Sequence, residues 1–370
     1  MSALFSPINL RSLSLPNRIV ISPMCQYSAV NGAATDWHLM HLGNLAMSGA
    51  SLLCLEATAV EADGRISPFD LGLWNDATEA ALVPVLALVR KYSNIALCVQ
   101  LAHAGRKASS KRPWDGGSLI MPVDGGWQPH APSPVPQKDG EPAPIELDSA
   151  GLHRIRTAFV DSATRAARLG FDAIELHGAH GYLLHQFLSP ISNRRTDGYG
   201  GSLENRFRFP LEVFDMVRAA FPADKPVGIK LSATDWIEGG WDLQQTIEFA
   251  HILKARGVDW IDVSTGGISR AQKIPVGPGY QVPFAEAVKS ATGVNTMAVG
   301  LITNALQAEE IISSGKADFV ALARGILFDP RWPWHAAAEL HAKVAAPPQY
   351  WRSEPQNSKG LFGDTVLGQR

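Results

Sequence analysis

The feature that most constrains the fold is a regular alternation, along nearly the whole chain, of short apolar β-branched runs with segments of helical periodicity. The predicted strands are Arg18–Pro23, Ala50–Ala57, Ile95–Ala102, Phe171–His177, Val227–Ser232, Trp260–Ser264, Thr296–Gly300 and Phe319–Ala323. The predicted helices between and after them are Asp36–Ser48, Ala77–Lys91, Asp148–Leu169, Leu203–Ala220, Leu243–Arg256, Pro283–Ala291, Ala305–Ser313 and Trp332–Ala345. Such alternation indicates a parallel sheet with crossover helices, and eight units favour closure over an open sheet. The predicted fold class is therefore α/β, a single (β/α)8 barrel of the TIM type.

Three segments lie outside this repeat. We expect residues 1–17 to form an N-terminal hairpin that closes one end of the barrel. The stretch from Pro113 to Pro144 is rich in Pro, Gly and Trp and lacks a helical period, which predicts a long loop after the third strand, at the mouth where barrels place their active sites. Residues 346–370 begin with prolines that cannot continue a helix and are expected to form an extended C-terminal arm. Residues 1–370 are read as one domain.

Composition points to small-molecule chemistry. The formal net charge is -2 and no basic stripe is present, so neither nucleic acid nor an anionic membrane is an expected partner. No segment reaches the roughly 18 apolar residues of a membrane-spanning helix, and we expect a cytoplasmic protein. Cys25, Cys54 and Cys98 are odd in number and far apart, which suits reduced thiols and cannot supply the four thiolates of an ordinary iron–sulfur cluster.

The most informative polar run is Glu175-Leu176-His177-Gly178-Ala179-His180-Gly181-Tyr182, at the end of the fourth predicted strand. The period of two puts Glu175 and His177 on one face, and the glycines let the chain bend so that His180 and Tyr182 reach the same cavity. A lone histidine on a strand is ordinarily a core or surface group, but two beside a tyrosine favour catalysis. Two donors and a weak acid suit a carbonyl that is polarised while a neighbouring carbon receives a proton. The run indicates a reductase or isomerase of carbonyl compounds.

Other polar residues interrupt or end predicted strands. Gln100 and Lys230 lie in apolar runs, and a buried lysine needs an anion, either a carboxylate such as Glu175 or Asp262 or a bound ligand. These two alternatives stay open at this point.

Gly300 and Arg324 follow the last two strands, where barrels often bind phosphate. A salt bridge from Arg324 to Asp329 is the structural alternative. His38 and His41 have helical i, i+3 spacing without a supporting carboxylate motif, so we expect no metal.

Several ordered motifs identify a family resemblance. They are Asn17-Arg18, Ser22-Pro23-Met24-Cys25-Gln26-Tyr27, Glu56-Ala57-Thr58, the run from Gln100 to Lys107, the run from His177 to Tyr182, the run from Ser192 to Arg206, and Gln349-Tyr350-Trp351-Arg352. Over nearly its whole length the chain resembles the old yellow enzyme family of FMN-dependent ene-reductases, in its bacterial thermophilic-like branch, which includes xenobiotic reductases.

The resemblance implies FMN as cofactor and NADPH or NADH as reductant. The implied FMN contacts are Ser22, Pro23, Met24, Cys25, Ala57, Gln100, Lys230, Gly300, Ala323 and Arg324. Lys230 would meet the N1/C2 edge of the flavin, and because the family often has Arg at this position, the charge is kept but the bidentate fork is lost.

The resemblance also implies a ping-pong reduction of activated alkenes. His177 and His180 would hold the carbonyl or nitro oxygen, Tyr182 would protonate the α-carbon, Cys25 would tune the flavin, and Tyr27 would cap the substrate cavity. Arg352 would enter the active site of a neighbouring subunit, which implies a homodimer or tetramer. The roles of Arg106, Lys107 and Trp351 are left open.

Four alternatives remain. An FMN-dependent quinone or nitro-compound reductase would use the same site. A dienoyl-CoA-reductase-like enzyme would share the barrel but needs cluster-binding cysteines and further domains that are absent from the sequence. An aldolase or isomerase barrel would use Lys230 as a Schiff base. A barrel that binds FMN without turnover is the non-enzymatic alternative.

Overall fold

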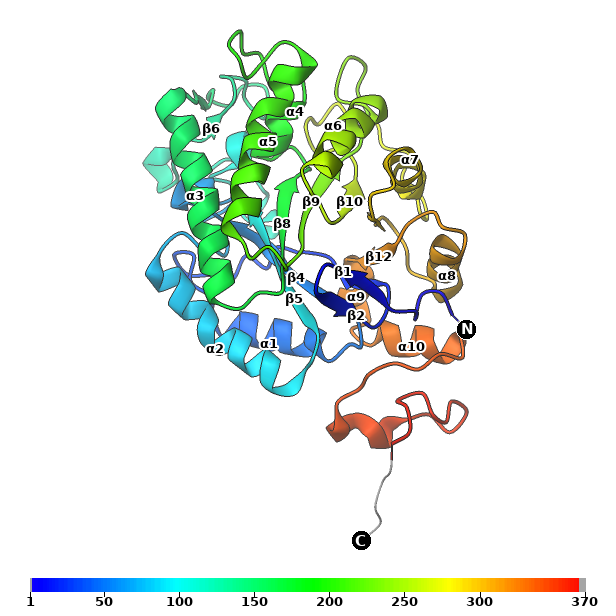
Figure 1. Cartoon of the computed structure of the whole chain (residues 1–370). Helices are drawn as coiled ribbons and strands as arrows, with labels where there is room; N and C mark the ends of the chain where they lie inside the picture. The colour runs from blue at the N-terminus through cyan, green and yellow to red at the C-terminus, as the bar shows by residue number, and fades with distance from the viewer. Residues whose placement is uncertain (1, 366–370) are drawn as a thin grey trace.

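The computed structural model describes residues 2–365, and its central element is a closed barrel of eight parallel strands. Around the ring the order is β10, β11, β12, β3, β4, β5, β8 and β9, so strands that follow one another in the barrel sequence are neighbours in space. The ring closes where β9 pairs with β10 and where β12 pairs with β3. The predicted (β/α)8 barrel is confirmed, and Figure 1 shows helices arranged around it.

The barrel strands and the helices follow the predicted alternation. The strands are β3 (Ile19–Ile21), β4 (Leu52–Ala59), β5 (Ala96–Ala102), β8 (Ala173–Gly178), β9 (Val227–Ser232), β10 (Ile261–Ser264), β11 (Thr296–Ala298) and β12 (Phe319–Leu322). The α-helices are α1 (Asp36–Ala46), α2 (Asp76–Tyr92), α3 (Ser149–Arg168), α4 (Leu183–Leu188), α5 (Leu203–Ala220), α6 (Leu243–Ala255), α7 (Val282–Thr292), α8 (Ala305–Ser313), α9 (Arg324–Phe328) and α10 (Trp332–Glu339). Among these helices none is long and apolar enough to cross a membrane.

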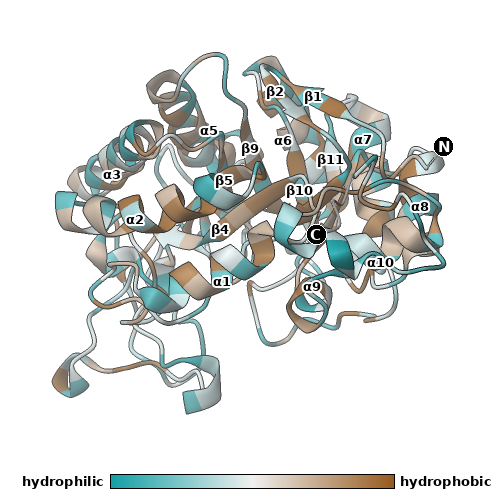
Figure 2. Ribbon diagram, turned by 90° about the horizontal axis from the view of Figure 1, so that it is seen from below, coloured by the Kyte–Doolittle hydropathy of each residue, from teal (hydrophilic) through white to brown (hydrophobic). Residues whose placement is uncertain are grey.

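Two apolar layers result from the strand period of two. Ile174 and Leu176 of β8 belong to the large core between the barrel and its helices, whereas Ala173 belongs to a smaller cluster inside the barrel. Because both faces are covered, a strand such as β4 is buried at every residue, and it is brown throughout most of its length in Figure 2. The apolar runs in the sequence are therefore the barrel wall.

An N-terminal hairpin closes the end of the barrel at which the strands begin. Strands β1 (Ile8–Leu10) and β2 (Leu13–Leu15) pair antiparallel. Leu10 and Leu15 are buried in the cluster inside the barrel, together with inward residues of the strands such as Leu52 and Trp260. This end is therefore filled with side chains, which leaves the opposite end, where the strands stop, for a ligand.

Close packing inside the barrel makes a stability prediction. A Cβ added at Gly228 would lie 2.0 Å from Cε2 of the buried Trp260, whereas one added at Gly43 in α1 would meet nothing within 4 Å. We expect Gly228→Ala to lower the free energy of unfolding by about 1–3 kcal/mol through overpacking. The matched Gly43→Ala should raise it by about 0.5–1 kcal/mol, because alanine is the better helix former. Urea unfolding measures both, and equal signs would contradict this packing.

The C-terminal region differs from the prediction. Helix α10 ends at Glu339 rather than Ala345, and the chain then turns through His341 at a φ of +51°. The arm is not extended: Pro348–Ser353 form a 3-10 helix (η5), and Leu361 and Phe362 pack against α10. Apolar side chains thus hold this part of the arm against α10, a tertiary effect that the local prolines do not reveal, and residues 366–370 of the predicted arm lie outside the described residues. The arm, in orange and red in Figure 1, lies at the end of the molecule opposite α4.

Two further helices were missed. The short α4 follows directly after Tyr182, and α9 follows β12, and both fall in stretches for which we predicted no helix. They are six and five residues long, which is too short for a helical period to stand out in the sequence. The long segment after β5 contains short 3-10 turns and the two-residue strands β6 (His130–Ala131) and β7 (Ile145–Glu146).

Candidate active site

His177, His180 and Tyr182 form one aromatic cluster at the mouth of the barrel. They lie on β8 and on the turn that leads to α4. The ring centroid of His177 is 5.2 Å from that of His180 and 4.8 Å from that of Tyr182, in edge-to-face arrangements. His180 adopts a left-handed φ of +58°, and Gly181 follows at +73°. This strained turn brings the three side chains together, as the spacing in the sequence predicts.

Burial keeps all three groups uncharged. It lowers the pKa of His177 well below its usual value, with further lowering by His180 and Lys230, and it likewise lowers the pKa of His180. It raises the pKa of the Tyr182 phenol well above its usual value. At neutral pH the cluster therefore has two neutral imidazoles and a protonated phenol, which are hydrogen-bond donors rather than charges.

Hydrogen bonds position both rings. The backbone N–H of Ala179 donates to His177 Nδ1 at 3.3 Å, which leaves the proton of the neutral ring on Nε2. His180 is held by two hydroxyls: its backbone N–H donates to Ser232 Oγ at 2.9 Å, and its Nε2 lies 2.7 Å from Ser264 Oγ. The sequence reasoning missed both serines. The available signal was a hydroxyl at the last residue of two consecutive strands, β9 and β10.

Below this cluster, the interior of the barrel holds a polar network. Lys230 Nζ donates to Asp262 Oδ2 at 2.5 Å. Gln100 Nε2 donates to Glu175 Oε1 at 2.8 Å, and Trp260 Nε1 donates to Glu175 Oε2 at 3.2 Å. The strand register produces this contact set because Gln100 is paired with Glu175, and Lys230 with both His177 and Asp262. The protein partner of Lys230 is thus the carboxylate of Asp262, one of the two acids suggested by the sequence.

The same network argues against an aldolase. Burial lowers the pKa of Lys230, but Asp262 and Glu175 outweigh it and leave that pKa above its usual value. A Schiff-base lysine needs the free amine, so a pKa shift in this direction disfavours that chemistry.

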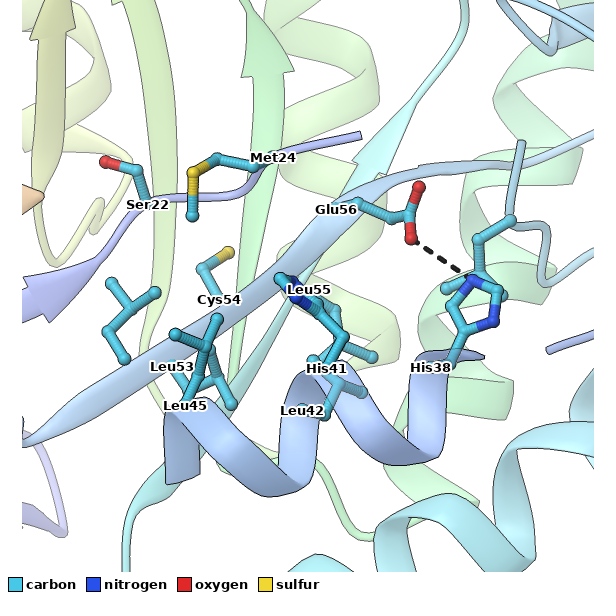
Figure 3. A pocket seen from close by; sticks show the side chains of 12 residues that line it. Ser22, Met24, His38, His41, Leu42, Leu45, Leu53, Cys54, Leu55 and Glu56 are labelled. Atoms are coloured by element: carbon cyan, nitrogen blue, oxygen red, sulfur yellow. Dashed lines mark ion pairs between the residues drawn. The ribbon is translucent and has the colours of Figure 1, made fainter. Parts of the chain in front are cut away.

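The loop after β3 brings Cys25 and Tyr27 toward the mouth. Burial raises the pKa of the Cys25 thiol, and Asp70 and Glu56 raise it further, so the sulfur stays protonated. Glu56 anchors this loop: its Oε2 accepts from the backbone N–H of Gln26 at 2.9 Å, and its Oε1 lies 3.2 Å from His38 Nε2, the pair drawn in Figure 3. His38 and His41 lie on α1, as predicted.

Tyr27 also packs on the long loop. Its ring meets that of Trp114 edge to face, with 5.5 Å between centroids. The pKa of Tyr27 is raised by burial and then by Cys25, so its phenol is neutral. Tyr27 therefore packs against an aromatic residue of the loop, as the alternative interpretation of this residue had it. This packing does not remove the phenol from the mouth of the barrel.

The expected phosphate end lies after β11 and β12. Gly300 has a φ of +118°, a conformation that side-chain-bearing residues rarely adopt. Arg324 is exposed at the start of α9. Its suggested partner Asp329 pairs instead with His335, whose Nδ1 lies 2.6 Å from Asp329 Oδ2. Arg324 forms no salt bridge with Asp329 or another acid among the described residues, so within residues 2–365 its guanidinium is available for a ligand.

Arg352 lies far from its own barrel mouth. It is an exposed residue of η5, and the start of the arm, from Ala345 to Pro348, lines a groove with Ser51 and Ile95, the residues that precede β4 and β5. Trp351 is half-buried and donates from Nε1 to the carbonyl of Ala346 at 3.0 Å. Trp351 therefore packs within its own arm.

The comparisons with known proteins decide the family. The model of the NADH:flavin oxidoreductase / NADH oxidase family matches residues 3–343. The chain belongs to this family. The predicted old yellow enzyme relationship is confirmed, and the protein is an FMN-dependent NAD(P)H oxidoreductase.

Individual relatives cover almost the whole chain. An NADPH dehydrogenase of Geobacillus thermodenitrificans is 44% identical over 95% of this chain and 98% of its own length. An NADPH dehydrogenase of Listeria innocua is 44% identical over 95% of this chain and 99% of its own. Among solved structures, morphinone reductase has a TM-score of 0.77 at 30% identity and covers 94% of this chain and 92% of its own.

The residues at the mouth fit FMN. The Ser22 hydroxyl at the end of β3 is buried and has no protein partner among the described residues, which suits a ligand that accepts or donates there. Lys230 supplies a buried cation beneath the mouth, and Arg324 supplies a fork-shaped donor at the phosphate end. These groups offer a hydroxyl, a buried cation and an exposed cation, which is the chemistry that a polar ring edge and a phosphate require.

Proposed function

We propose that this oxidoreductase reduces activated carbon–carbon double bonds, in enones, enals, maleimides and nitroalkenes, by a ping-pong cycle in which NADPH or NADH reacts first and the alkene second. The observation that carries the proposal is the neutral cluster of His177, His180 and Tyr182 at the mouth of an FMN-dependent barrel. Bound FMN supplies the hydride acceptor and donor. Everything else in the reaction is assigned to side chains of the protein.

The two histidines hold the oxygen of the substrate. His177 Nε2–H, fixed by the Ala179 contact, and the His180 ring, oriented by Ser232 and Ser264, donate to a carbonyl or nitro oxygen. Neutral donors stabilise the negative charge that develops on this oxygen without paying to desolvate a cation. Withdrawal of charge into the oxygen makes the β-carbon of the alkene electrophilic.

Tyr182 delivers the proton. Its raised pKa keeps the phenol protonated at neutral pH, and its ring lies against that of His177. A weak acid in this place can protonate the α-carbon, which completes saturation of the double bond. Tyr27 is assigned to the wall of the substrate cavity, and the protonated Cys25 to tuning of the cofactor by a weak hydrogen bond.

FMN is assigned to residues from several strand ends. They are Ser22, Pro23, Met24, Cys25, Ala57, Gln100, Lys230, Gly300, Ala323 and Arg324. In this assignment the Lys230 ammonium, which Asp262 holds, would supply positive charge to the ring system of FMN, and Arg324 would bind its phosphate.

The test is an anaerobic half-reaction experiment with the purified holoenzyme. NADPH in limiting amount should bleach the flavin absorbance, and 2-cyclohexenone should restore it. Bleaching without recovery by any activated alkene, but with recovery by a quinone or a nitro compound, would replace the proposed reaction by the alternative one.

We further propose a homo-oligomer, a dimer or tetramer, in which Arg352 completes the active site of a neighbouring subunit. The proposal is supported by the position of Arg352, which is exposed on an arm that starts beside the beginnings of β4 and β5. A residue so placed cannot serve the mouth of its own barrel, but it can extend to another. The cytoplasmic location stays a prediction.

Mixed oligomers test this arrangement. Arg352→Ala and Tyr182→Phe should each lower enone turnover, and subunits of the two variants that are mixed and reassembled should regain part of it. In a mixed dimer, one site combines the intact Tyr182 of one subunit with the intact Arg352 of the other. Steady-state turnover after co-refolding measures the gain, and no gain despite demonstrated mixing would count against a shared site.

A further inference from the structure

A second cavity lies beside the aromatic cluster and is rich in cations. It has a volume of about 260 Å³, and its lining includes Arg106, Lys107, Ser110, Gln137, Glu141 and Arg270. Lys107 connects it to the catalytic cluster: its Nζ donates to the carbonyl of His180 at 2.8 Å and lies 4.9 Å from the centre of the Tyr182 ring. The cavity is therefore next to the site where the reactants meet, and distinct from it.

Arg106 is buried and Lys107 is half-buried, and neither forms a salt bridge with a carboxylate among residues 2–365. Lys107 Nζ donates to the carbonyls of His180 and Gly267, and the Arg106 guanidinium donates to those of Val135, Pro136 and Ile268. Arg106 Nε is buried and has no partner in the described part of the chain. Buried cations are ordinarily paired with an anion, so carbonyls alone leave the charge uncompensated.

Burial destabilises the charged forms of Arg106 and Lys107. Burial lowers the pKa of Arg106 to about 10 and that of Lys107 to about 8, and for Lys107 the neighbouring Arg106 and Arg270 lower it further. The charge of Asp235 raises the pKa of Arg106 in part, but Asp235 is paired with another residue, since its Oδ1 lies 2.9 Å from His185 Nε2. Arg270 is exposed at the rim of the cavity and adds a third positive charge.

We propose that this cavity, formed by Arg106, Lys107 and Arg270, is an oxyanion subsite that binds the phosphate groups of the nicotinamide reductant. The inference rests on the proposed function, in which the hydride donor places its nicotinamide ring beside His177 and His180. The rest of the donor, including its phosphates, must then extend away from this cluster in one direction. Lys107 lies on that path, between the Tyr182 ring and the cavity. A phosphate would supply the missing anion and accept several charge-assisted hydrogen bonds.

Glu141 gives the subsite an internal control. It is the acid in the cavity lining, so its carboxylate opposes an incoming phosphate. Removal of the negative charge by Glu141→Gln should tighten binding a few fold. Arg270→Ala should weaken it about tenfold, the usual size for one lost hydrogen bond to a charged group. Arg270 is exposed and Glu141 is half-buried in a loop, so neither change removes a core side chain.

The experiment is an anaerobic stopped-flow titration of flavin bleaching in the holoenzyme. Arg270→Ala should raise the apparent dissociation constant for NADPH, leave the limiting rate unchanged, and leave the reaction with N-benzyl-dihydronicotinamide, which carries no phosphate, unchanged. Lys273→Ala is the matched control, because Lys273 is exposed on the same loop and does not line the cavity. A defect with NADPH alone assigns the subsite to the 2′-phosphate, and a defect with NADH as well assigns it to the diphosphate.

Two results would overturn the inference. One is an unchanged dissociation constant for NADPH in both Arg270→Ala and Glu141→Gln, and the other is an equal shift for the phosphate-free donor. This outcome is distinguishable from that of the proposed function. Ene-reduction is measured by the recovery of flavin absorbance, whereas the subsite is measured by the dependence of flavin bleaching on NADPH concentration. If no nicotinamide bleaches the flavin, calorimetric titration with ADP and with adenosine 2′,5′-bisphosphate still tests the subsite. Binding of either compound that Arg270→Ala weakens supports the proposal, and binding of neither to the wild type refutes it.

Discussion

Tyr182→Phe is expected to slow reoxidation of the reduced enzyme by 2-cyclohexenone by about 10²–10⁴-fold, the usual contribution of a general acid. The change removes one hydroxyl and keeps the ring that packs against His177 at 4.8 Å, so the site should keep its shape. Reduction by NADPH needs no proton from this phenol and should be nearly unaffected. Anaerobic stopped-flow measurement of each half-reaction separates the two rates.

The control for Tyr182→Phe is Tyr92→Phe, in an exposed residue of α2. It should change neither half-reaction. Equal slowing of both half-reactions in Tyr182→Phe would mean that the hydroxyl shapes the cavity rather than supplies the proton. A solvent isotope effect on reoxidation, present in the wild type and altered in the variant, would distinguish a proton-transfer role from a purely structural one.

Lys230→Met is expected to lower the free energy of unfolding by about 3–5 kcal/mol, because it leaves Asp262 as an uncompensated charge inside the barrel. Asp262 is 1% exposed and its Oδ2 lies 2.5 Å from Lys230 Nζ, so water cannot replace the lost ammonium. The same variant should bind FMN more weakly, since it removes the buried cation assigned to the flavin. Urea unfolding of the apoprotein and equilibrium dialysis of FMN measure the two effects.

Two comparisons make the Lys230 result specific. Lys289→Met breaks a partly exposed pair with Asp318, at 3.0 Å, and should cost at most about 1 kcal/mol. Lys230→Arg keeps the charge and should retain both stability and FMN. A loss in Lys230→Met no larger than that in Lys289→Met would show that the pair is not the stabilising element. Loss of FMN in Lys230→Arg would show that the ammonium, and not the charge alone, is required.

The fold was predictable because barrel strands have an unambiguous local signal. Strands such as β4 and β9 are buried on both faces, and their continuous apolar runs stand out between amphipathic helices. The cluster of His177, His180 and Tyr182 was predictable for a similar reason: its members lie within six consecutive positions, and one strand end with two glycines brings them together. Family motifs then named FMN as the cofactor, which spacing alone did not.

What sequence reasoning could not predict depends on contacts between distant residues. Ser232 and Ser264 orient His180 from two other strands, and although each ends its strand, its position in the sequence does not reveal its partner. Lys107 meets the His180 carbonyl across 73 positions, and Arg270 reaches the same cavity from the loop after β10. The C-terminal arm was predicted as extended because its prolines are visible locally, whereas the apolar contacts of Leu361 and Phe362 that fold it back are not.

The sequence by itself determined the barrel, the cofactor family and the aromatic cluster of His177, His180 and Tyr182, because strand periodicity, turn glycines and contiguous motifs are local properties of the chain. Only the tertiary structure decided which carboxylate holds Lys230, that Asp329 pairs with His335 rather than Arg324, and that Arg106 and Lys107 donate to backbone carbonyls beside one cavity. The physical reason is that electrostatic partners are selected by distance in space and by exclusion of water. Both are set by strand register and loop packing, which bring together residues far apart along the chain.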